Sequence, residues 1–497
     1  MQNLPARTYK QQIFSNTLIQ TIAKVVSIFV GIGSAMILTR YLGPAGYGEY
    51  NTVIVFVFIF SIISDLGVYQ ILLRELSQKE DEREKILGNI YFWRIISSFS
   101  IFFLAAIIGF CFPYGQIVKY AIVIEAARSF VYAIRTFYVT DFKLKLRMDI
   151  ASYGEILNRI SFILLLFVVF YYNLNFVTIF IFIFLATVID YLWVAFYFRK
   201  ISDKIKPRFD SQYLKLFLKE SLPVGVSVFL GMLHFKGDTL LLSILKSPED
   251  VGIYSVGSRI LENVVMLPGL FLAIIFPKLS QLAINRKKDL AIFFNKTVKI
   301  LIIAVLPISL FLIVLAPWIV TLIAGPEYSA AIWITRILSL AVIAIFLSAP
   351  YIQLLIAARK QNILAWISLV TVIVNLGLNL IFIPKYSYQG AAVITLLTEI
   401  LLAILVIIAS QKLTNYKIRW SNFLVIFPLF LDLFLLWIFT KLVDLNIFTQ
   451  QLIFIQLLEI IFLILLFGLT HVVFSIKFKI IPLEWVYEIL GKGENEA

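Results

Sequence analysis

Four basic residues interrupt long apolar stretches of this chain, where a cation is costly unless something binds it. They are Lys24, Arg128, Lys236 and Arg259. A charge at the centre of a bilayer costs about 2.5 to 3.5 kcal/mol or more, so each is expected to face a cavity or a partner. Arginine binds phosphate through two parallel hydrogen bonds, and lysine supplies a point charge. This pattern indicates a cationic cavity able to bind an anion.

Lys24 lies near the middle of the first apolar segment, and no acidic residue lies three or four positions from it. Residues at that spacing share one face of a helix, so charges there can neutralise each other. For such pairs a salt bridge that only holds helices together is about as plausible as a binding role. The pairs are Glu125 with Arg128, Glu155 with Arg159, and Arg259 with Glu262.

Three intramembrane carboxylates, Asp65, Asp238 and Glu262, are candidates for coupling or for structural roles. Protonation of such a group can favour one conformational state. Asp65 belongs to an Asp-Leu-Gly sequence that predicts a helix break or a partner on another helix. Lys236 and Asp238 flank Gly237, which predicts a polar interruption of a span. Basic residues slightly outnumber acidic ones in our count of the spans.

The elements that carry these residues are predicted to be membrane-spanning helices. The chain of 497 residues is 61% hydrophobic and 14% charged, whereas soluble domains carry roughly a quarter charged residues. A spanning helix needs about 20 mostly apolar residues, and barrel strands would alternate instead. We predict an all-α polytopic protein of about fourteen helices, at 13–38, 50–73, 86–111, 117–140, 150–171, 176–198, 217–244, 252–276, 297–323, 331–357, 362–383, 388–410, 421–443 and 449–475.

Basic residues are concentrated in alternate connections between these spans. About 30 of the 43 Lys and Arg residues fall in one set of connections, and the other set holds little more than Arg40, Lys119, Lys246, Lys385 and Lys441. Cytoplasmic loops are enriched in this way, so both termini are predicted to be cytoplasmic. The net charge of +14 then reflects topology rather than nucleic-acid binding. No cleaved signal peptide is expected at the N-terminus.

A short repeat indicates duplication. The pattern P-x-x-x-G-x-Y occurs at 44–50 and again at 248–254, each after an odd-numbered span. Transporters commonly arise by duplication, with the binding site between the repeats. We therefore predict an N-terminal six-helix lobe (1–198), a cytoplasmic linker (199–216), a C-terminal six-helix lobe (217–410), and helices 13 and 14 with a cytoplasmic tail (411–497). The repeated motif is expected in an outer loop where its proline sets a turn.

The residues from Leu38 to Tyr50, the Asp65-Leu66-Gly67 sequence, and Tyr388 to Ala392 resemble the polysaccharide repeat-unit flippases (Wzx-type) of the multidrug/oligosaccharidyl-lipid/polysaccharide exporter superfamily. The resemblance covers nearly the whole chain. It implies a two-lobed bundle with a cationic central cavity. It also implies that an oligosaccharide on a polyprenyl diphosphate is flipped from the cytoplasmic to the outer leaflet of the cell (inner or plasma) membrane, by alternating access, for O-antigen, capsule or exopolysaccharide biosynthesis.

The resemblance implies membrane lipids as surroundings, and a polysaccharide polymerase and a chain-length regulator as partners. No cofactor, metal or nucleic acid is expected: His234 and His471 are far apart, and the single cysteine, Cys111, forms no cluster. An ion-coupled multidrug antiporter of the same superfamily is the nearest alternative, although its cavity should be acidic. A membrane-embedded polymerase or glycosyltransferase is the enzyme alternative, but the predicted outer connections are short.

Overall fold

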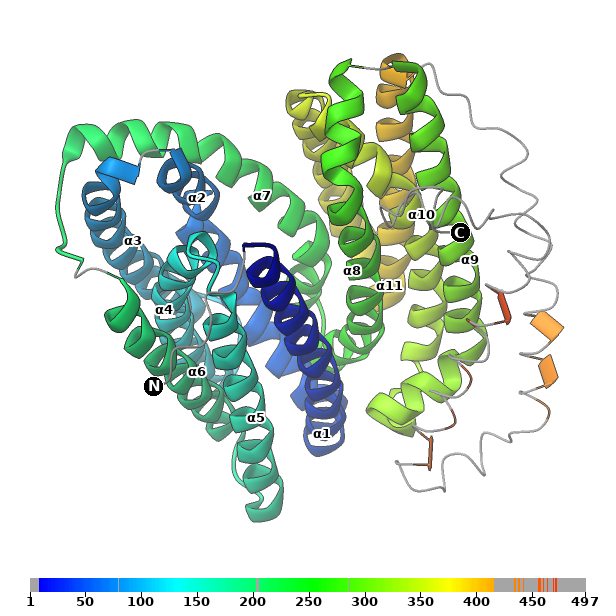
Figure 1. The fold of residues 1–497 in the computed structure, drawn as a ribbon. Coiled ribbons are helices and arrows are strands. Elements are labelled where there is room, and N and C mark those ends of the chain that lie inside the picture. The colour runs from blue at the N-terminus through cyan, green and yellow to red at the C-terminus, as the bar shows by residue number, and fades with distance from the viewer. Residues whose placement is uncertain are drawn as a thin grey trace. The chain divides into compact units, whose positions relative to one another are not determined.

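The computed structural model describes residues 9–78, 80–202, 205–285 and 287–414, together with scattered residues beyond 414. In these ranges every element of regular secondary structure is a helix (Figure 1). Nine of the described helices are long and apolar enough to cross a membrane. The predicted all-α membrane fold is therefore confirmed.

The chain divides into two compact units, Met1–Val251 and Gly252–Ala497. The main helices of the first unit are α1 (Tyr9–Asp65), α2 (Val68–Gln78), α3 (Arg83–Cys111), α4 (Gln116–Leu144), α5 (Met148–Tyr172), α6 (Phe176–Ile201) and α7 (Ser211–Leu245). The helix α8 (Pro248–Asn285) begins at the boundary, and α9 (Lys287–Ala324), α10 (Ala331–Ala357) and α11 (Gln361–Thr414) follow in the second unit. The short 3₁₀ helices η1 (Glu80–Glu82) and η2 (Pro326–Tyr328) lie in connections.

Two of these helices each contain two spans joined at a kink. The backbone leaves helical geometry at Gly43 in α1 (φ 62°, ψ 179°) and at Ser387 in α11 (φ 50°, ψ −135°). With these divisions, helices occupy the positions of the first twelve predicted spans. The predicted spans 421–443 and 449–475 fall almost wholly outside the described residues. The total of about fourteen helices stays a prediction.

The repeated P-x-x-x-G-x-Y motif begins a helix in both places, so the predicted outer loop is wrong. Pro44 follows the kink at Gly43 directly, and Pro248 is the first residue of α8. Proline suits the first helical position because its missing N–H would have no partner there and its φ is already helical. The last tyrosine of the second copy, Tyr254, is buried, and its hydroxyl lies 3.2 Å from that of Thr395 on α11.

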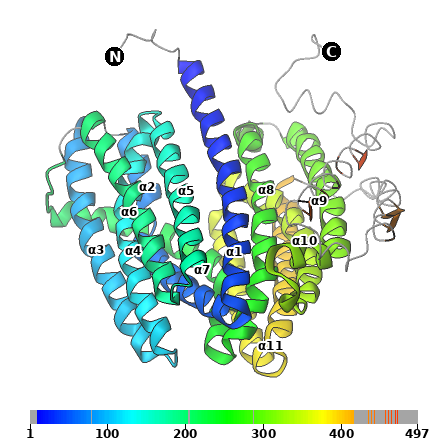
Figure 2. The ribbon, with the colours of Figure 1, turned by 90° about the horizontal axis from the view of Figure 1, so that it is seen from below.

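In the first unit α4 packs against α1, α3, α5 and α6, and these helices stand side by side (Figure 2). Many of the buried apolar side chains of this unit form two clusters. One is centred on Ile86, Ile90 and Phe142, and the other on Val57, Ile122 and Phe180. In the second unit α10 packs against both α9 and α11.

The helix α7, which the sequence analysis assigned to the second lobe, packs against α1, α2 and α3 in the first unit. Its closest approach is at the break between α1 and α2. Leu66 and Gly67 there have positive φ angles of 42° and 75°, so the predicted helix break is confirmed. A Cβ on Gly225 of α7 would lie 2.4 Å from the backbone carbon of Leu66. Only glycine fits this crossing.

The segment that enters α7 is tied to the N-terminal end of α3. The Arg208 N–H donates to the Gly88 carbonyl (3.2 Å), and the Asp210 N–H donates to the Asn89 side chain (2.6 Å). Asp210 also caps α7 by accepting from the Tyr213 N–H (3.0 Å), and it lies 3.2 Å from the Lys85 ammonium. The bond from Tyr213, with Lys85 adding to it, lowers the pKa of Asp210 below its usual value.

Replacing Gly225 by alanine is expected to destabilise the first unit, because the new methyl group would collide with the backbone at Leu66. Overpacking of this kind costs about 1 to 3 kcal/mol. Gly231→Ala on the same helix is the control: nothing lies within 4 Å of its Cβ position, and alanine is the better helix former. Thermal unfolding in detergent measures both. Equal midpoints for the two variants would contradict the close crossing.

Asp210→Asn is expected to lower the unfolding temperature at neutral pH, since asparagine keeps the helix cap but loses the charge that Lys85 faces. A lowered pKa in the folded state means that the charged form stabilises the protein above the usual aspartate pKa. This stabilisation is lost as the pH falls through the folded-state value. The difference between variant and parent should therefore shrink in acid. A difference independent of pH would argue against this role.

Candidate functional site

The four predicted cavity cations lie on four different helices. Lys24 is on α1, Arg128 on α4, Lys236 on α7 and Arg259 on α8. The first three belong to the first unit, and Arg259 belongs to the second. Their joint role in one site therefore stays a prediction.

Lys24 lies about midway along the first part of α1, between Tyr9 and the kink at Gly43. Its side chain is exposed, and it makes no ion pair or hydrogen bond within the described part of the chain. In hydrocarbon an ammonium without a partner is strongly unfavourable. Lys24 must therefore face water, lipid headgroups or an anionic ligand when the helix spans a membrane.

Arg128 is compensated by Glu125 on the preceding turn of α4. The guanidinium donates from Nε to Glu125 Oε2 at 2.7 Å and from Nη2 to Oε1 at 2.5 Å. The side chain of Glu125 is 1% exposed, whereas that of Arg128 is 23% exposed. The exposed edge of Arg128 also lies over the ring of Tyr132, 6.0 Å from its centroid. An anion that binds Arg128 must therefore share it with Glu125.

Buried Arg94 and partly exposed Asp65 form a second pair, between α3 and the end of α1. Arg94 Nη1 donates to Asp65 Oδ1 at 2.9 Å and to the Ser64 carbonyl at 3.2 Å, and Nε donates to the Ala133 carbonyl on α4 at 3.3 Å. One guanidinium thus ties three helices together at the break before Gly67. Asp65 therefore has a partner on another helix, as its Asp-Leu-Gly sequence predicted.

A third pair joins Arg135 on α4 to Asp190 on α6. The Arg135 Nε and Asp190 Oδ2 atoms lie 3.0 Å apart, and Arg135 Nη2 donates to the Ala151 carbonyl on α5 at 3.0 Å. Gly154 allows α5 to pass because a Cβ there would lie 2.3 Å from Asp190 Oδ1. Asp190 was not among the site residues predicted from the sequence. A lone aspartate within the apolar run 176–198 was the available signal.

The expected ion pair between Glu155 and Arg159 is absent from the described part of the chain. Glu155 instead accepts a hydrogen bond from Ser27 on α1 at 3.0 Å. Helix spacing brought the two residues to one face, but the neighbouring helix supplied a different partner for the carboxylate.

The expected basic surplus in the spans is small. Asp190, Asp432 and Glu459 lie inside the predicted spans and were left out of the count. The same spans also contain Glu220, Lys119, Lys219, Lys299 and Lys441, so that a full count gives 12 basic and 10 acidic residues. The independent support for an anionic ligand is therefore Lys24 itself, and not the overall sum of charges.

Lys236 and Asp238 lie within an unbroken helix, so the predicted interruption at Gly237 is wrong. Gly237 and Asp238 are buried, and Lys236 is half-buried with its ammonium 5.9 Å from the centroid of the Phe235 ring. On α8, Arg259 is half exposed and its Nη1 lies 3.7 Å from Glu262 Oε2. The roles of Asp238 and Glu262 in coupling stay predictions.

Asp141 at the end of α4 is a further buried charge that the sequence analysis did not identify. Its carboxylate is fully buried, pairs with Arg83, accepts from the Ser202 hydroxyl, and lies 3.3 Å from the Lys145 ammonium. These contacts join α3, α4 and the end of α6. No group of three or more potential metal ligands occurs among the described residues.

Breaking the Glu125 pair tests whether it supports the fold. Arg128→Gln leaves a buried carboxylate without its partner, which costs about 3 to 5 kcal/mol. The double variant Glu125→Gln with Arg128→Gln removes both charges and should recover much of that loss. Unfolding midpoints of the two single variants, the double variant and the parent form a double-mutant cycle. Strictly additive effects would contradict the pairing.

Two protein-family profiles match the sequence of this chain. A family profile described as "Polysaccharide biosynthesis protein" matches residues 13–283, and a second profile, MatE, matches residues 223–382. A sequence search of curated proteins found no match.

Several solved structures are similar to the chain. A lipid II flippase MurJ in an inward closed conformation has 15% identity and a TM-score of 0.74, covering 93% of this chain and 98% of that one. An inward-facing multidrug resistance MATE transporter of the MOP superfamily has 13% identity and a TM-score of 0.65, covering 78% and 94%. A MOP superfamily transporter from Pyrococcus furiosus Vc1 (DSM3638), reported with a binding pocket of reverse polarity, has 14% identity and a TM-score of 0.58, covering 82% and 96%.

At these identities the structural likeness establishes the fold alone, which is that of a MOP-superfamily transporter. The family and the fold place the chain among flippases and exporters and not among enzymes. Because the first profile matches more than half of the sequence, the chain belongs to the polysaccharide biosynthesis protein family.

Proposed function

We propose that the protein flips a polyprenyl-diphosphate-linked oligosaccharide repeat unit from the cytoplasmic to the outer leaflet by alternating access of two lobes. The product would serve cell-surface polysaccharide biosynthesis in the cell membrane, with both termini cytoplasmic. A polymerase and a chain-length regulator would then act on the exported unit. The observation that carries the proposal is family membership over 13–283, the part of the chain that holds Lys24 and Arg128.

Lys24 gives the proposal its chemistry. It is an exposed cation inside an apolar helix, without a partner in the described residues, and a diphosphate brings at least two negative charges to such a position. Arg128 can contribute a second, weaker contact through the edge of its guanidinium that Glu125 does not use. The polyprenyl chain would remain in the bilayer while the charged head group crosses.

A multidrug antiporter is the second candidate, because the MatE profile matches residues 223–382 and MATE transporters share the fold. A cationic drug would be repelled by Lys24 and attracted by an uncompensated carboxylate. Three carboxylates of the first unit, Asp65, Glu125 and Asp190, each have an arginine partner, so none of these three offers a cationic drug an uncompensated charge. This arrangement favours the flippase.

Flipping of a fluorescent polyprenyl-diphosphate oligosaccharide in proteoliposomes tests the proposal. Lys24→Gln should reduce the rate about tenfold or more, the ratio for a loss of about 1.4 kcal/mol, whereas Lys24→Arg should retain most of it. Lys215→Gln, at an exposed lysine near the start of α7, is the matched control and should leave the rate unchanged.

Two outcomes would count against the flippase. A parent protein that does not flip this substrate but accumulates cationic drugs against a gradient would support the antiporter. Equal flipping by Lys24→Gln and the parent would remove Lys24 from the substrate path.

A further inference from the structure

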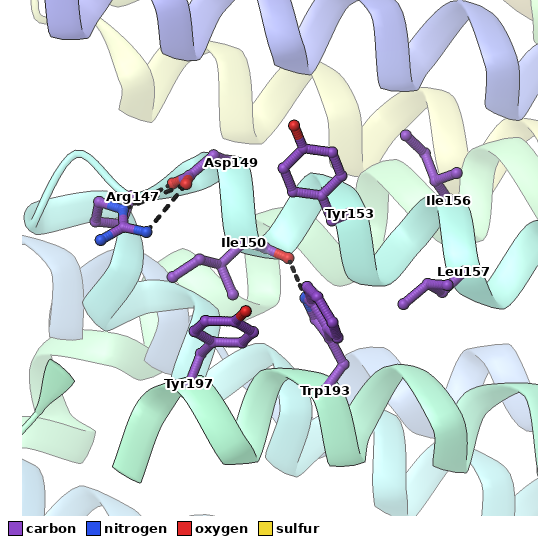
Figure 3. Close-up of a pocket in the computed structure, with 8 residues that line it drawn as sticks. All are labelled: Arg147, Asp149, Ile150, Tyr153, Ile156, Leu157, Trp193 and Tyr197. Atoms are coloured by element: carbon purple, nitrogen blue, oxygen red, sulfur yellow. Dashed lines mark hydrogen bonds and ion pairs between the residues drawn. The ribbon is translucent and has the colours of Figure 1, made fainter. Parts of the chain in front are cut away.

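A pocket of about 370 Å³ lies between α5 and α6 in the first unit. Figure 3 shows Arg147 and Asp149 at one end, Ile156 and Leu157 at the other, and the rings of Tyr153, Trp193 and Tyr197 along the sides. The pocket therefore changes from charged to apolar along its length. An amphipathic ligand fits this gradient.

The pocket is long enough to hold part of one lipid, from its headgroup to the upper part of an acyl chain, along the side of α5. Its lining begins at Arg147, directly before α5, and ends at Leu157. Ten residues of helix span about 15 Å, which is about half the hydrocarbon thickness of a bilayer. A headgroup at the start of α5 would thus place an acyl chain against Ile156 and Leu157 within one leaflet. On the predicted orientation this is the cytoplasmic leaflet.

The charged end carries one cation and one anion, both accessible. Arg147 donates to Asp149 from Nε at 3.0 Å and from Nη2 at 3.1 Å, so its Nη1 edge remains available. The side chains of Arg147 and Asp149 are 45% and 25% exposed. A headgroup with both a phosphate and an ammonium complements this pair, whereas a purely anionic headgroup would be repelled by Asp149.

The aromatic wall adds fixed surface and further donors. Trp193 is held in place because its Nε1 donates to the Ile150 carbonyl at 3.1 Å, and its ring lies 4.8 Å from that of Tyr197. The hydroxyls of Tyr153 and Tyr197 make no hydrogen bond within the described ranges. Tyrosine and tryptophan rings favour the headgroup level of a bilayer.

We propose that this pocket is a binding site for a phospholipid with a primary ammonium headgroup, such as phosphatidylethanolamine. The phosphate is bound by Arg147 Nη1 and the two tyrosine hydroxyls, the ammonium by Asp149, and an acyl chain lies along Ile156 and Leu157. A quaternary ammonium, as in phosphatidylcholine, has no N–H to donate to Asp149. The lining of this pocket includes none of Lys24, Arg128, Lys236 and Arg259.

Lipids with brominated acyl chains test the site, since bromine quenches tryptophan fluorescence at short range. The Trp193 signal is the difference in quenching between the full-length parent and Trp193→Phe in vesicles of one lipid class. This difference should be at least about threefold larger with brominated phosphatidylethanolamine than with brominated phosphatidylglycerol or phosphatidylcholine. One additional net hydrogen bond to the headgroup is enough to produce a ratio of this size.

In the double variant Arg147→Gln with Asp149→Asn, the quenching of Trp193 by brominated phosphatidylethanolamine should fall to the value measured with brominated phosphatidylcholine. Tyr153→Phe with Tyr197→Phe keeps the rings, removes only the hydroxyls and should lower the preference without unfolding the protein. The matched control is Arg208→Gln with Glu84→Gln, an exposed pair at 3.1 Å outside the pocket, which should leave the signal intact.

Equal quenching by all three lipids, or stronger quenching by phosphatidylglycerol, would overturn the proposal and leave only annular lipid at this surface. Because the assay measures lipid binding and not flipping, its failure says nothing about the proposed transport. Conversely, an inactive transporter could still show the lipid preference.

Discussion

The first unit depends on the requirement that a charge in a membrane protein interior must have a partner. Arg94 joins α1, α3 and α4 through Asp65 and two carbonyls. Arg135 joins α4, α5 and α6 through Asp190 and the Ala151 carbonyl. Apolar side chains alone cannot specify how helices pack in lipid, because the lipid is equally apolar. These ion pairs supply the missing specificity.

This requirement also separates structural charges from functional ones. Asp65, Glu125 and Asp190 are each neutralised by an arginine at hydrogen-bonding distance. Lys24 is not neutralised within the described residues. A cation that helps to hold helices together would be buried beside a carboxylate, whereas a cation that binds a passing anion must stay accessible. On the proposed function, the exposure of Lys24 favours it as the stronger substrate contact, and the pairing of Arg128 with Glu125 makes Arg128 the weaker candidate.

The sequence predicted the helices well and their partners poorly, for a physical reason. Span length and apolarity are local, so twelve span positions and the break at Gly67 could be predicted. Contacts within one helix follow from spacing, which is how Glu125 and Arg128 were paired. The pairing of Glu155 failed because its partner, Ser27, is 128 residues away on another helix. The position of Asp190 within an apolar run was a usable signal, but its partner could not be predicted because Arg135 lies on another helix, α4.

A lipid II flippase and a multidrug transporter share this fold, so a difference in substrate must arise from the side chains and not from the helix arrangement. What distinguishes them is the sign of the uncompensated charge that lines the path. A structural relative from Pyrococcus furiosus is reported with a pocket of reverse polarity, so polarity varies on this scaffold while the helices do not. One lysine without a carboxylate partner is then more informative than the full sum of charges, since paired residues cancel and contribute little at a distance.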